Sequence, residues 1–263
     1  MRFALNHIIS PRQSLPEFFA MAKALGCTDV EIRNDMKGAA IANGISATEV
    51  RAAADRAGVK IITINALYPF NVWEGDMPER AAKLARFAAD CGAEALVMCP
   101  LNEGKPVSRE SLVAGLKAVK PILQAHKLTG LVEALGFHFS SMRTKAEAIS
   151  AIKEVGGEGT FKLVHDTFHH HLAGEKEFYP EWTGLVHISG VSDSKIAVND
   201  MLDAHRVLVD DRDRLGNIPQ IKTLLAAGYT GPFSFEPFSA EVQDLADHAA
   251  ALKASMDYIA GHI

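Results

Sequence analysis

Four apolar segments in the second half of the chain each carry an acid or a histidine that could bind a metal ion or move a proton. These side chains are Glu133, Asp166, His187 and Glu236, in or at the end of the segments GLVEAL, FKLVHD, LVHISG and PFSFEPF. Buried carboxylates repel one another and are costly to remove from water unless a cation compensates their charge. Three carboxylates with one imidazole suit Mn²⁺, Mg²⁺ or Co²⁺, and Zn²⁺ also accepts such a set. The pattern therefore predicts one divalent metal ion bound by these four residues.

Each of these residues has a simpler explanation when it is taken alone. A glutamate after a strand commonly caps a helix or lies on the surface. A single buried histidine is commonly a hydrogen-bonded core residue, and the run His169–His171 could lie in a solvated loop. The metal interpretation depends on the recurrence of an acid or a histidine on four consecutive strand-like segments. Because no cysteine takes part, we do not expect a closed structural zinc site.

These side chains need a frame that brings the strand ends together. Eight strand-like segments alternate with helical segments, and no Pro/Gly/Ser-rich linker separates any two of the units. With about 33 residues per unit, the 263 residues are typical of a (β/α)8 barrel of about 250 residues. We therefore predict a single-domain α/β (β/α)8 TIM barrel over residues 1–263. The expected strands are Arg2–Leu5, Asp29–Ile32, Lys60–Ile64, Ala95–Cys99, Gly130–Ala134, Phe161–Val164, Leu185–Ser189 and Pro232–Glu236.

The helical segments carry their own start and stop signals. Capping boxes at Ser14–Glu17, Ser46–Glu49 and Thr144–Glu147 predict three helix starts. Glycines predict helix ends, and we expect the last helix to run from about Val242 to Ile259 without interruption. A doubly wound open sheet would be favoured by a glycine-rich phosphate turn after an early strand, and LNHIIS after the first strand has none. The barrel is therefore preferred.

Composition excludes several other classes of protein. Hydrophobic residues make up 48% of the chain and charged residues 22%, which fits a globular protein with a sizeable core. The formal charge of −5 and the absence of a basic cluster argue against a nucleic-acid partner. No apolar run approaches the roughly 18 residues of a membrane span, and no signal sequence precedes the first strand. Cys27, Cys91 and Cys99 have no paired spacing, so we expect reduced thiols and a cytoplasmic location.

Several segments together resemble the xylose-isomerase-like TIM barrels, the sugar phosphate isomerase/epimerase family. Within that family the chain is most similar to inosose isomerases and hydroxypyruvate isomerases. The resemblance extends over essentially the whole chain and rests on VEAL, HDTFH, VHISGV, HRVLVDDRDRLGNI and FSFEPF. It implies that His169 contacts substrate, that Arg206 faces substrate, and that the metal ligands are Glu133, Asp166, His187 and Glu236. Many relatives have a glycine-rich turn after this arginine, where this chain has VDDRDR at residues 209–214.

The resemblance implies a metal-dependent isomerase or epimerase that acts on a keto-sugar or a keto-inositol of the inosose type. The reaction would pass through an enediolate, with Glu133 and Glu236 as the acid and base. We also expect Asn6 and Trp73 to contact the substrate. Trp73 belongs to an aromatic cluster with Tyr68 and Phe70 that could close over an apolar ring face or simply pack within its loop.

Three other functions remain open at this level. An inosose dehydratase-type lyase would use the same metal site and lose a β-hydroxyl after proton abstraction. An apurinic endonuclease shares the barrel, but it needs a basic groove and more histidine and aspartate ligands. A metal or sugar binder without catalysis would keep the site and lack hydrogen exchange. Residues 191–215 form a long connection that we expect to be a lid or a subunit contact, and assembly into a homo-oligomer is left open.

Overall fold

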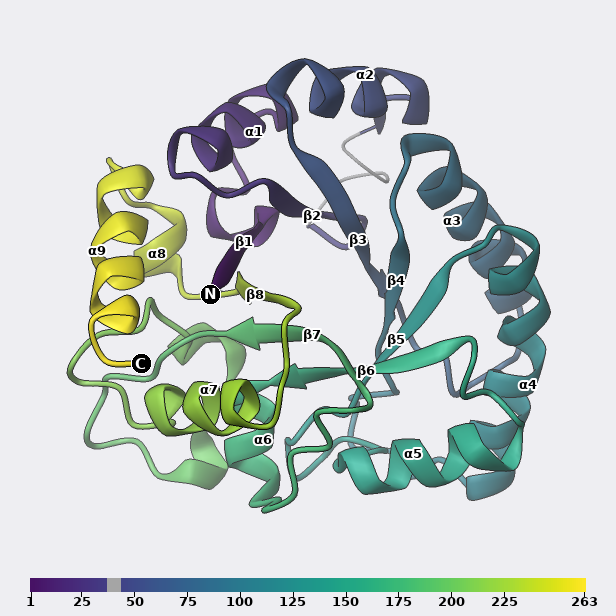
Figure 1. Ribbon diagram of the computed structural model, residues 1–263. Coiled ribbons are helices and arrows are strands. Elements are labelled where there is room, and N and C mark those ends of the chain that lie inside the picture. The colour runs from purple at the N-terminus through teal and green to yellow at the C-terminus, as the bar shows by residue number, and fades with distance from the viewer. Residues whose placement is uncertain (37–43) are drawn as a thin grey trace.

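Eight parallel strands close into one barrel, with each strand hydrogen-bonded to its neighbours in the order β1 to β8 (Figure 1). The computed structural model describes residues 1–36 and 44–263. The predicted fold class is confirmed. The strands are β1 (Arg2–Asn6), β2 (Asp29–Arg33), β3 (Lys60–Leu67), β4 (Ala95–Met98), β5 (Thr129–Glu133), β6 (Phe161–Asp166), β7 (Thr183–Ile188) and β8 (Pro232–Phe235).

Helices surround the barrel. Two of the three capping boxes predicted from the sequence form completely. The boxes at Ser14 and Ser46 form completely, because the glutamate three residues on accepts a hydrogen bond from the serine amide. At Thr144 only the threonine oxygen takes part, accepting from the Glu147 amide at 3.3 Å. The helices are α1 (Leu15–Ala24), α2 (Ala47–Ala57), α3 (Met77–Cys91), α4 (Arg109–Ala125), α5 (Lys145–Glu154), α6 (Thr167–Ala173), α7 (Asn217–Ala226), α8 (Ala240–Gln243) and α9 (His248–Ala260).

The expected single helix from Val242 to Ile259 is wrong, because the chain forms the short α8 and then the separate α9. Asp247 lies between them, and its carboxylate accepts a hydrogen bond from the Ala250 amide at 2.9 Å. This bond satisfies an orphan amide at the start of α9, so a new helix begins where the apolar periodicity alone would continue the old one.

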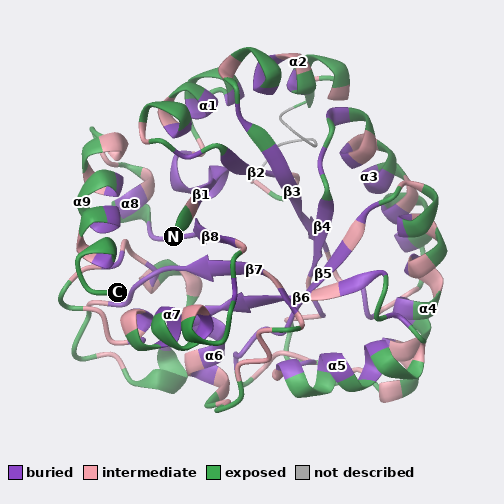
Figure 2. Cartoon of the chain, in the orientation of Figure 1, coloured by how far each residue is buried: buried purple, intermediate pink, exposed green. Residues whose placement is uncertain are grey.

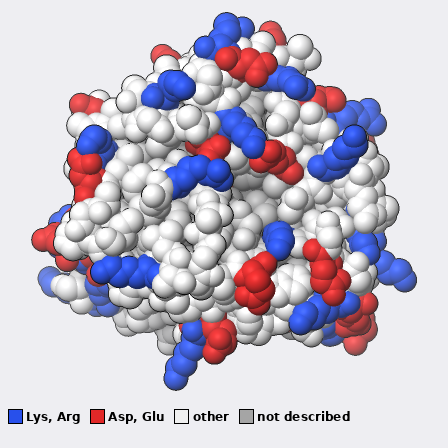
Figure 3. All heavy atoms as spheres, viewed as in Figure 1, with Lys and Arg blue, Asp and Glu red and all other residues white. Residues whose placement is uncertain are grey.

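The core has two layers. Small and branched side chains from the strands fill the barrel interior, and a larger layer lies between the strands and the helices. The strands are buried almost throughout, whereas the helices bury one face and expose the other (Figure 2). None of the described helices has the length and apolarity needed to cross a membrane. On the face shown in Figure 3, basic and acidic side chains intermingle around a central hollow and form no broad basic patch.

Candidate metal centre

The barrel brings the four predicted ligands to one place. Glu133 and Asp166 end β5 and β6, His187 lies in β7, and Glu236 directly follows β8. One ligand atom from each residue lies within 4.8 Å of the others, and all four residues are buried. We call this group the four-ligand cage. The closure of parallel strands explains the convergence, because their carboxyl ends meet on one face of the barrel.

His187 lies at the centre of the cage. Its Nδ1 is 3.3 Å from Glu133 Oε1, 3.1 Å from Glu236 Oε2 and 3.8 Å from Asp166 Oδ2. Burial would lower the pKa of His187, but the charges of Glu236 and Glu31 and the hydrogen bond with Glu133 outweigh it and hold this pKa well above 6.5. The acids therefore create a strongly cation-attracting position next to Nδ1.

Glu31, in the middle of β2, also belongs to the candidate site, although the sequence alone does not single it out. It is 0% exposed and accepts hydrogen bonds from Asn65 Nδ2 at 2.7 Å and Ser234 Oγ at 2.5 Å. Its Oε2 lies 3.2 Å from His187 Nε2. A carboxylate in this position accepts the Nε2 hydrogen and leaves Nδ1 directed at the cage, as is usual for metal-binding histidines. The available signal was a charged residue within the otherwise buried segment DVEIR.

Two buried arginines neutralise part of the negative charge of the cage. Arg206 Nη2 lies 2.6 Å from Asp166 Oδ2 and 3.0 Å from Glu236 Oε2, while Arg33 Nη1 lies 2.8 Å from Glu236 Oε1. Burial would raise the pKa of Glu236, but His187 and the two arginines outweigh it and keep this pKa below its ordinary value. Glu236 is therefore held as a carboxylate.

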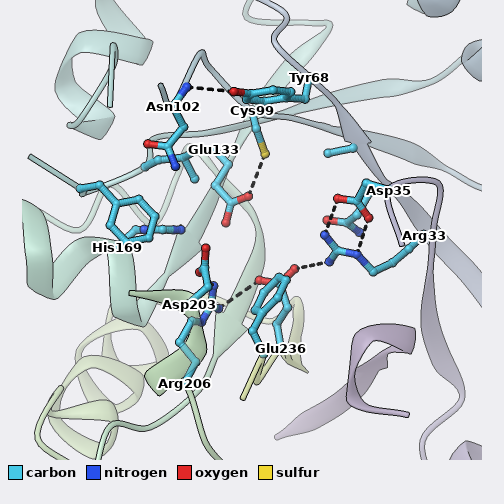
Figure 4. A pocket seen from close by; sticks show the side chains of 15 residues that line it. Arg33, Asp35, Tyr68, Cys99, Asn102, Glu133, His169, Asp203, Arg206 and Glu236 are labelled. Atoms are coloured by element: carbon cyan, nitrogen blue, oxygen red, sulfur yellow. Dashed lines mark hydrogen bonds and ion pairs between the residues drawn. The ribbon is translucent and has the colours of Figure 1, made fainter. Parts of the chain in front are cut away.

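A cavity of about 240 Å³ opens above the cage (Figure 4). Glu133 and Glu236 reach into it from different sides, with His169 and Arg206 beside them. His169 Nδ1 and Asn102 Oδ1 are buried atoms without a hydrogen-bond partner among the described residues. The remaining lining mixes charged and apolar groups: Arg33, Asp35, Asn65, Ala66, Tyr68, Cys99, Leu135, Phe137, Asp203 and Phe238.

Residues 19–261 match the family model described as the xylose isomerase-like TIM barrel. The chain belongs to this family. A xylose isomerase domain containing protein from Salmonella typhimurium LT2 is 36% identical, with a TM-score of 0.92 over 99% of this chain and 96% of that one. No curated protein sequence matches the chain.

More distant solved structures of this barrel type share the fold. The IolI protein, solved with a bound zinc atom, is 18% identical, with a TM-score of 0.87 over 100% of this chain and 99% of that one. D-psicose 3-epimerase from Clostridium cellulolyticum H10, solved with D-tagatose, is 16% identical, with a TM-score of 0.76 over 100% of this chain and 99% of that one.

The donor set of this xylose isomerase-like barrel fits a divalent ion. Three carboxylates and one imidazole supply four possible ligands, and a cation would compensate the buried negative charge that the two arginines leave. Cys99 borders the cage, where its Sγ donates a hydrogen bond to Glu133 Oε2 at 3.4 Å. Burial and the charge of Glu133 raise the pKa of the Cys99 thiol well above 9.

Two expected substrate contacts lie elsewhere. Asn6 is fully buried and does not line the cavity, and its Nδ2 donates to Glu236 Oε1 at 3.1 Å. It therefore orients a cage residue. Trp73 packs partly buried against the core outside the cavity lining, because its loop turns Phe70 into the core and Tyr68 toward the cavity. The aromatic cluster thus divides, and only Tyr68 borders the site.

The histidine run does not form a solvated loop. It lies in α6, where His169 and His170 are buried and His171 is half-buried. His169 faces the cavity, whereas His170 belongs with His165 to a separate cluster around Lys145. Of the five acidic and imidazole groups between 165 and 171, only Asp166 and His169 therefore border the site.

Proposed function

We propose that this protein is a divalent-metal-dependent isomerase or epimerase that acts on a keto-sugar or a keto-inositol. The observation that carries this proposal is the pair Glu133 and Glu236, which share one cage and reach one cavity from different sides. The metal would be held by these two residues with Asp166 and His187. When bound, it would polarise a substrate carbonyl and stabilise the charge that develops as a neighbouring proton leaves.

The two glutamates divide the proton transfers between them. One removes the proton from the carbon next to the carbonyl. In an epimerisation, the other returns a proton to the opposite face of the same carbon. In an isomerisation, it delivers a proton to the former carbonyl carbon while the hydroxyl proton moves to the former carbonyl oxygen. Arg206, Arg33 and His187 keep Glu236 ionised, as a proton acceptor must be, although the same cations weaken it as a base. The Cys99 thiol and Glu133 share a hydrogen bond that fixes the orientation of the second carboxylate.

The polar atoms that lack partners indicate a substrate rich in hydroxyl groups. His169 Nδ1 and Asn102 Oδ1 are buried beside the cavity, and a buried polar atom without a hydrogen bond is costly. Substrate hydroxyls would supply both missing bonds. Phe137 and Phe238 would cover the less polar C–H face of the same molecule. The solved epimerases that share this fold, named for D-psicose and L-ribulose, also support a polyol ketone.

Hydrogen exchange tests the proposal directly. Keto-inositols and ketoses are incubated in D₂O with Mn²⁺, and NMR follows deuterium entry at the carbon next to the carbonyl. We expect exchange with wild-type protein and a loss of at least about 100-fold in Glu133→Gln and in Glu236→Gln, because each lacks a general acid–base group. Both variants should still bind metal, although more weakly.

Glu103→Gln is the matched control, since Glu103 is an exposed acid near Tyr68 that is not part of the cage. It should exchange at the wild-type rate. Full exchange in either cage variant would remove that glutamate from the mechanism. A growing enone absorbance in the ultraviolet would instead identify the inosose dehydratase-type lyase.

A further inference from the structure

A second cluster of titratable groups lies behind β6, away from the cavity lining. Its centre is the ammonium group of Lys145, the first residue of α5, which is only 4% exposed. The lysine Nζ lies 3.1 Å from His165 Nδ1, 2.7 Å from His170 Nδ1 and 3.4 Å from Glu175 Oε2. Phe178 covers the group, stacking on His165 at a centroid distance of 5.3 Å. We call these residues the Lys145 cluster.

The hydrogen bonds of the cluster determine where each proton lies. Gln220 Nε2 donates to Thr167 O at 3.1 Å and to Leu215 O at 2.9 Å, so its Oε1 must be an acceptor. That Oε1 lies 2.9 Å from His165 Nε2, which therefore carries the hydrogen. The Nδ1 of His165 is left as an acceptor for the lysine.

All three ammonium hydrogens thus have an acceptor: two neutral imidazoles and one carboxylate. Burial and the nearby lysine charge lower the pKa of His170 to about 3, so this imidazole is neutral at ordinary pH. Burial lowers the pKa of Lys145 to about 8, although Glu175 acts in the opposite direction. A buried polar cluster with every group satisfied holds its members in one arrangement.

The Lys145 cluster contains the residues next in sequence to two site residues, Asp166 and His169. His165 precedes Asp166 on β6, and successive strand residues point to opposite faces, so Asp166 faces the cage while His165 faces Lys145. His170 follows His169 at the start of α6. Asp166 also caps this helix, because its Oδ1 accepts from the His169 amide at 3.1 Å.

We propose that Lys145 is a positioning residue that fixes the corner between β6 and α6, and thereby sets Asp166 in the cage and His169 in the cavity. The proposal rests on the proposed function for the role of His169 but not for the metal ligand Asp166. Lys145 does not line the large cavity, and within the described residues its side chain forms hydrogen bonds and ion pairs with His165, His170 and Glu175 and with no cage ligand. It borders a small pocket that Asp166 and His169 also line.

The test is Lys145→Met, which keeps the length of the side chain and removes its three donors. The corner is then free to shift, so we expect about a tenfold loss of Mn²⁺ affinity, as for other groups that orient metal ligands. Titration of Mn²⁺ by electron paramagnetic resonance measures this loss without any substrate. With an exchanging ketone, KM should rise several-fold while kcat per metal-loaded protein changes little. A merely structural role would reduce the folded fraction and leave both the metal Kd and KM unchanged.

Lys120→Met is the matched control. Lys120 ties the other end of α5, where its Nζ donates to Val155 O at 3.0 Å and to Gly156 O at 2.5 Å, and it has no contact with the β6–α6 corner. It should lower the melting temperature without changing the metal Kd. If Lys145→Met does not fold, His170→Phe removes one acceptor and should shift the metal Kd in the same direction.

The outcomes separate the two proposals. An unchanged metal Kd in a folded Lys145→Met or His170→Phe protein overturns the positioning role. A wild-type protein that binds Mn²⁺ but exchanges no ketone overturns the proposed function and leaves the positioning of Asp166 to be decided by the metal titration alone.

Discussion

At the scale of single residues, Glu31 decides which nitrogen of His187 faces the four-ligand cage. A neutral imidazole has one N–H donor and one lone-pair acceptor, and only the lone pair binds a metal. Glu31 is an acceptor already fixed by Asn65 and Ser234, so it takes the hydrogen of Nε2. Removing this carboxylate would remove the acceptor that holds the ring hydrogen on Nε2, away from the cage.

The first prediction is that Glu31→Gln weakens metal binding by about 10- to 100-fold, the range typical for groups that orient a metal-binding histidine. The amide can donate as well as accept, so it no longer enforces the correct tautomer. Competition with a chelator of known affinity measures the change. Asp29→Asn on the same strand is the control, because Asp29 pairs with Arg2 near the opposite end of the barrel. Equal metal affinity in wild type and Glu31→Gln would mean that the tautomer is set by other groups.

The sequence allowed us to predict which residues gather in the cage, but it said less about the individual contacts that each site residue makes. The convergence of the four cage residues could be predicted because each interrupts or ends an apolar strand. Glu31 could not, because its partner His187 is 156 residues away and the contact exists only once the barrel closes. Asn6 and Trp73 were predicted to contact substrate but lie outside the cavity lining. Asn6 ends β1 and is buried beside Glu236, whereas Trp73 lies in the loop after β3 and packs against the core.

At the scale of elements, the loop after β5 and helix α6 meet at a contact that only glycine allows. A Cβ on Gly136 would lie 2.1 Å from the carbonyl oxygen of His169 and 2.9 Å from the amide nitrogen of Ala173. Arg143 spans the same contact, since its Nη2 donates to Gly136 O at 2.9 Å and to Leu172 O at 3.3 Å. The loop therefore supports α6 from one side, and the Lys145 cluster supports it from the other.

The second prediction is that Gly136→Ala displaces α6 and raises KM for an exchanging ketone at least about fivefold, because His169 moves with the helix and near-attack geometry tolerates little error. Steady-state kinetics at saturating Mn²⁺ measure the effect. Gly159→Ala is the matched control, because a Cβ there would meet nothing within 4 Å and the backbone has an ordinary φ. An unchanged KM in Gly136→Ala would show that the loop after β5 moves to accommodate the methyl group while α6 keeps its position.

Strand and helix positions followed from local signals, whereas their ends depended on neighbours. The third strand extends to Leu67, three residues beyond the predicted end, because β4 pairs with it as far as Met98. The final helix divides because the Asp247 carboxylate starts a new one. The long connection at 191–215 is tied to the barrel by a bridge between Gly190 and Val207, and it contributes Asp203 to the cavity. Its role as a lid or subunit contact stays a prediction.

At the scale of the whole molecule, the cage joins strands that are distant in sequence. Glu133, Asp166, His187 and Glu236 come from β5 to the end of β8, and Glu31 adds β2 across the barrel. These buried groups include four carboxylates, which face one imidazole and the guanidinium groups of Arg33 and Arg206. Burying like charges together opposes closure of the barrel, and a bound cation would reverse this effect. Metal binding should therefore be coupled to the stability of the entire fold.

The third prediction concerns this coupling. At free Mn²⁺ about 100 times its Kd, mass action should stabilise the folded protein by about 2.7 kcal/mol. For a chain of this size that corresponds to a rise in melting temperature of about 5 to 10 °C, which chelation should reverse and calorimetry can measure. Asp166→Asn should lose most of the shift because it removes a cage carboxylate. Asp203→Asn should keep it, because this half-exposed acid pairs with Arg206 outside the cage. If Asp166→Asn kept the full shift, the stabilising ion would have to bind elsewhere, for example at the histidines of α6, and the cage would not be the metal centre.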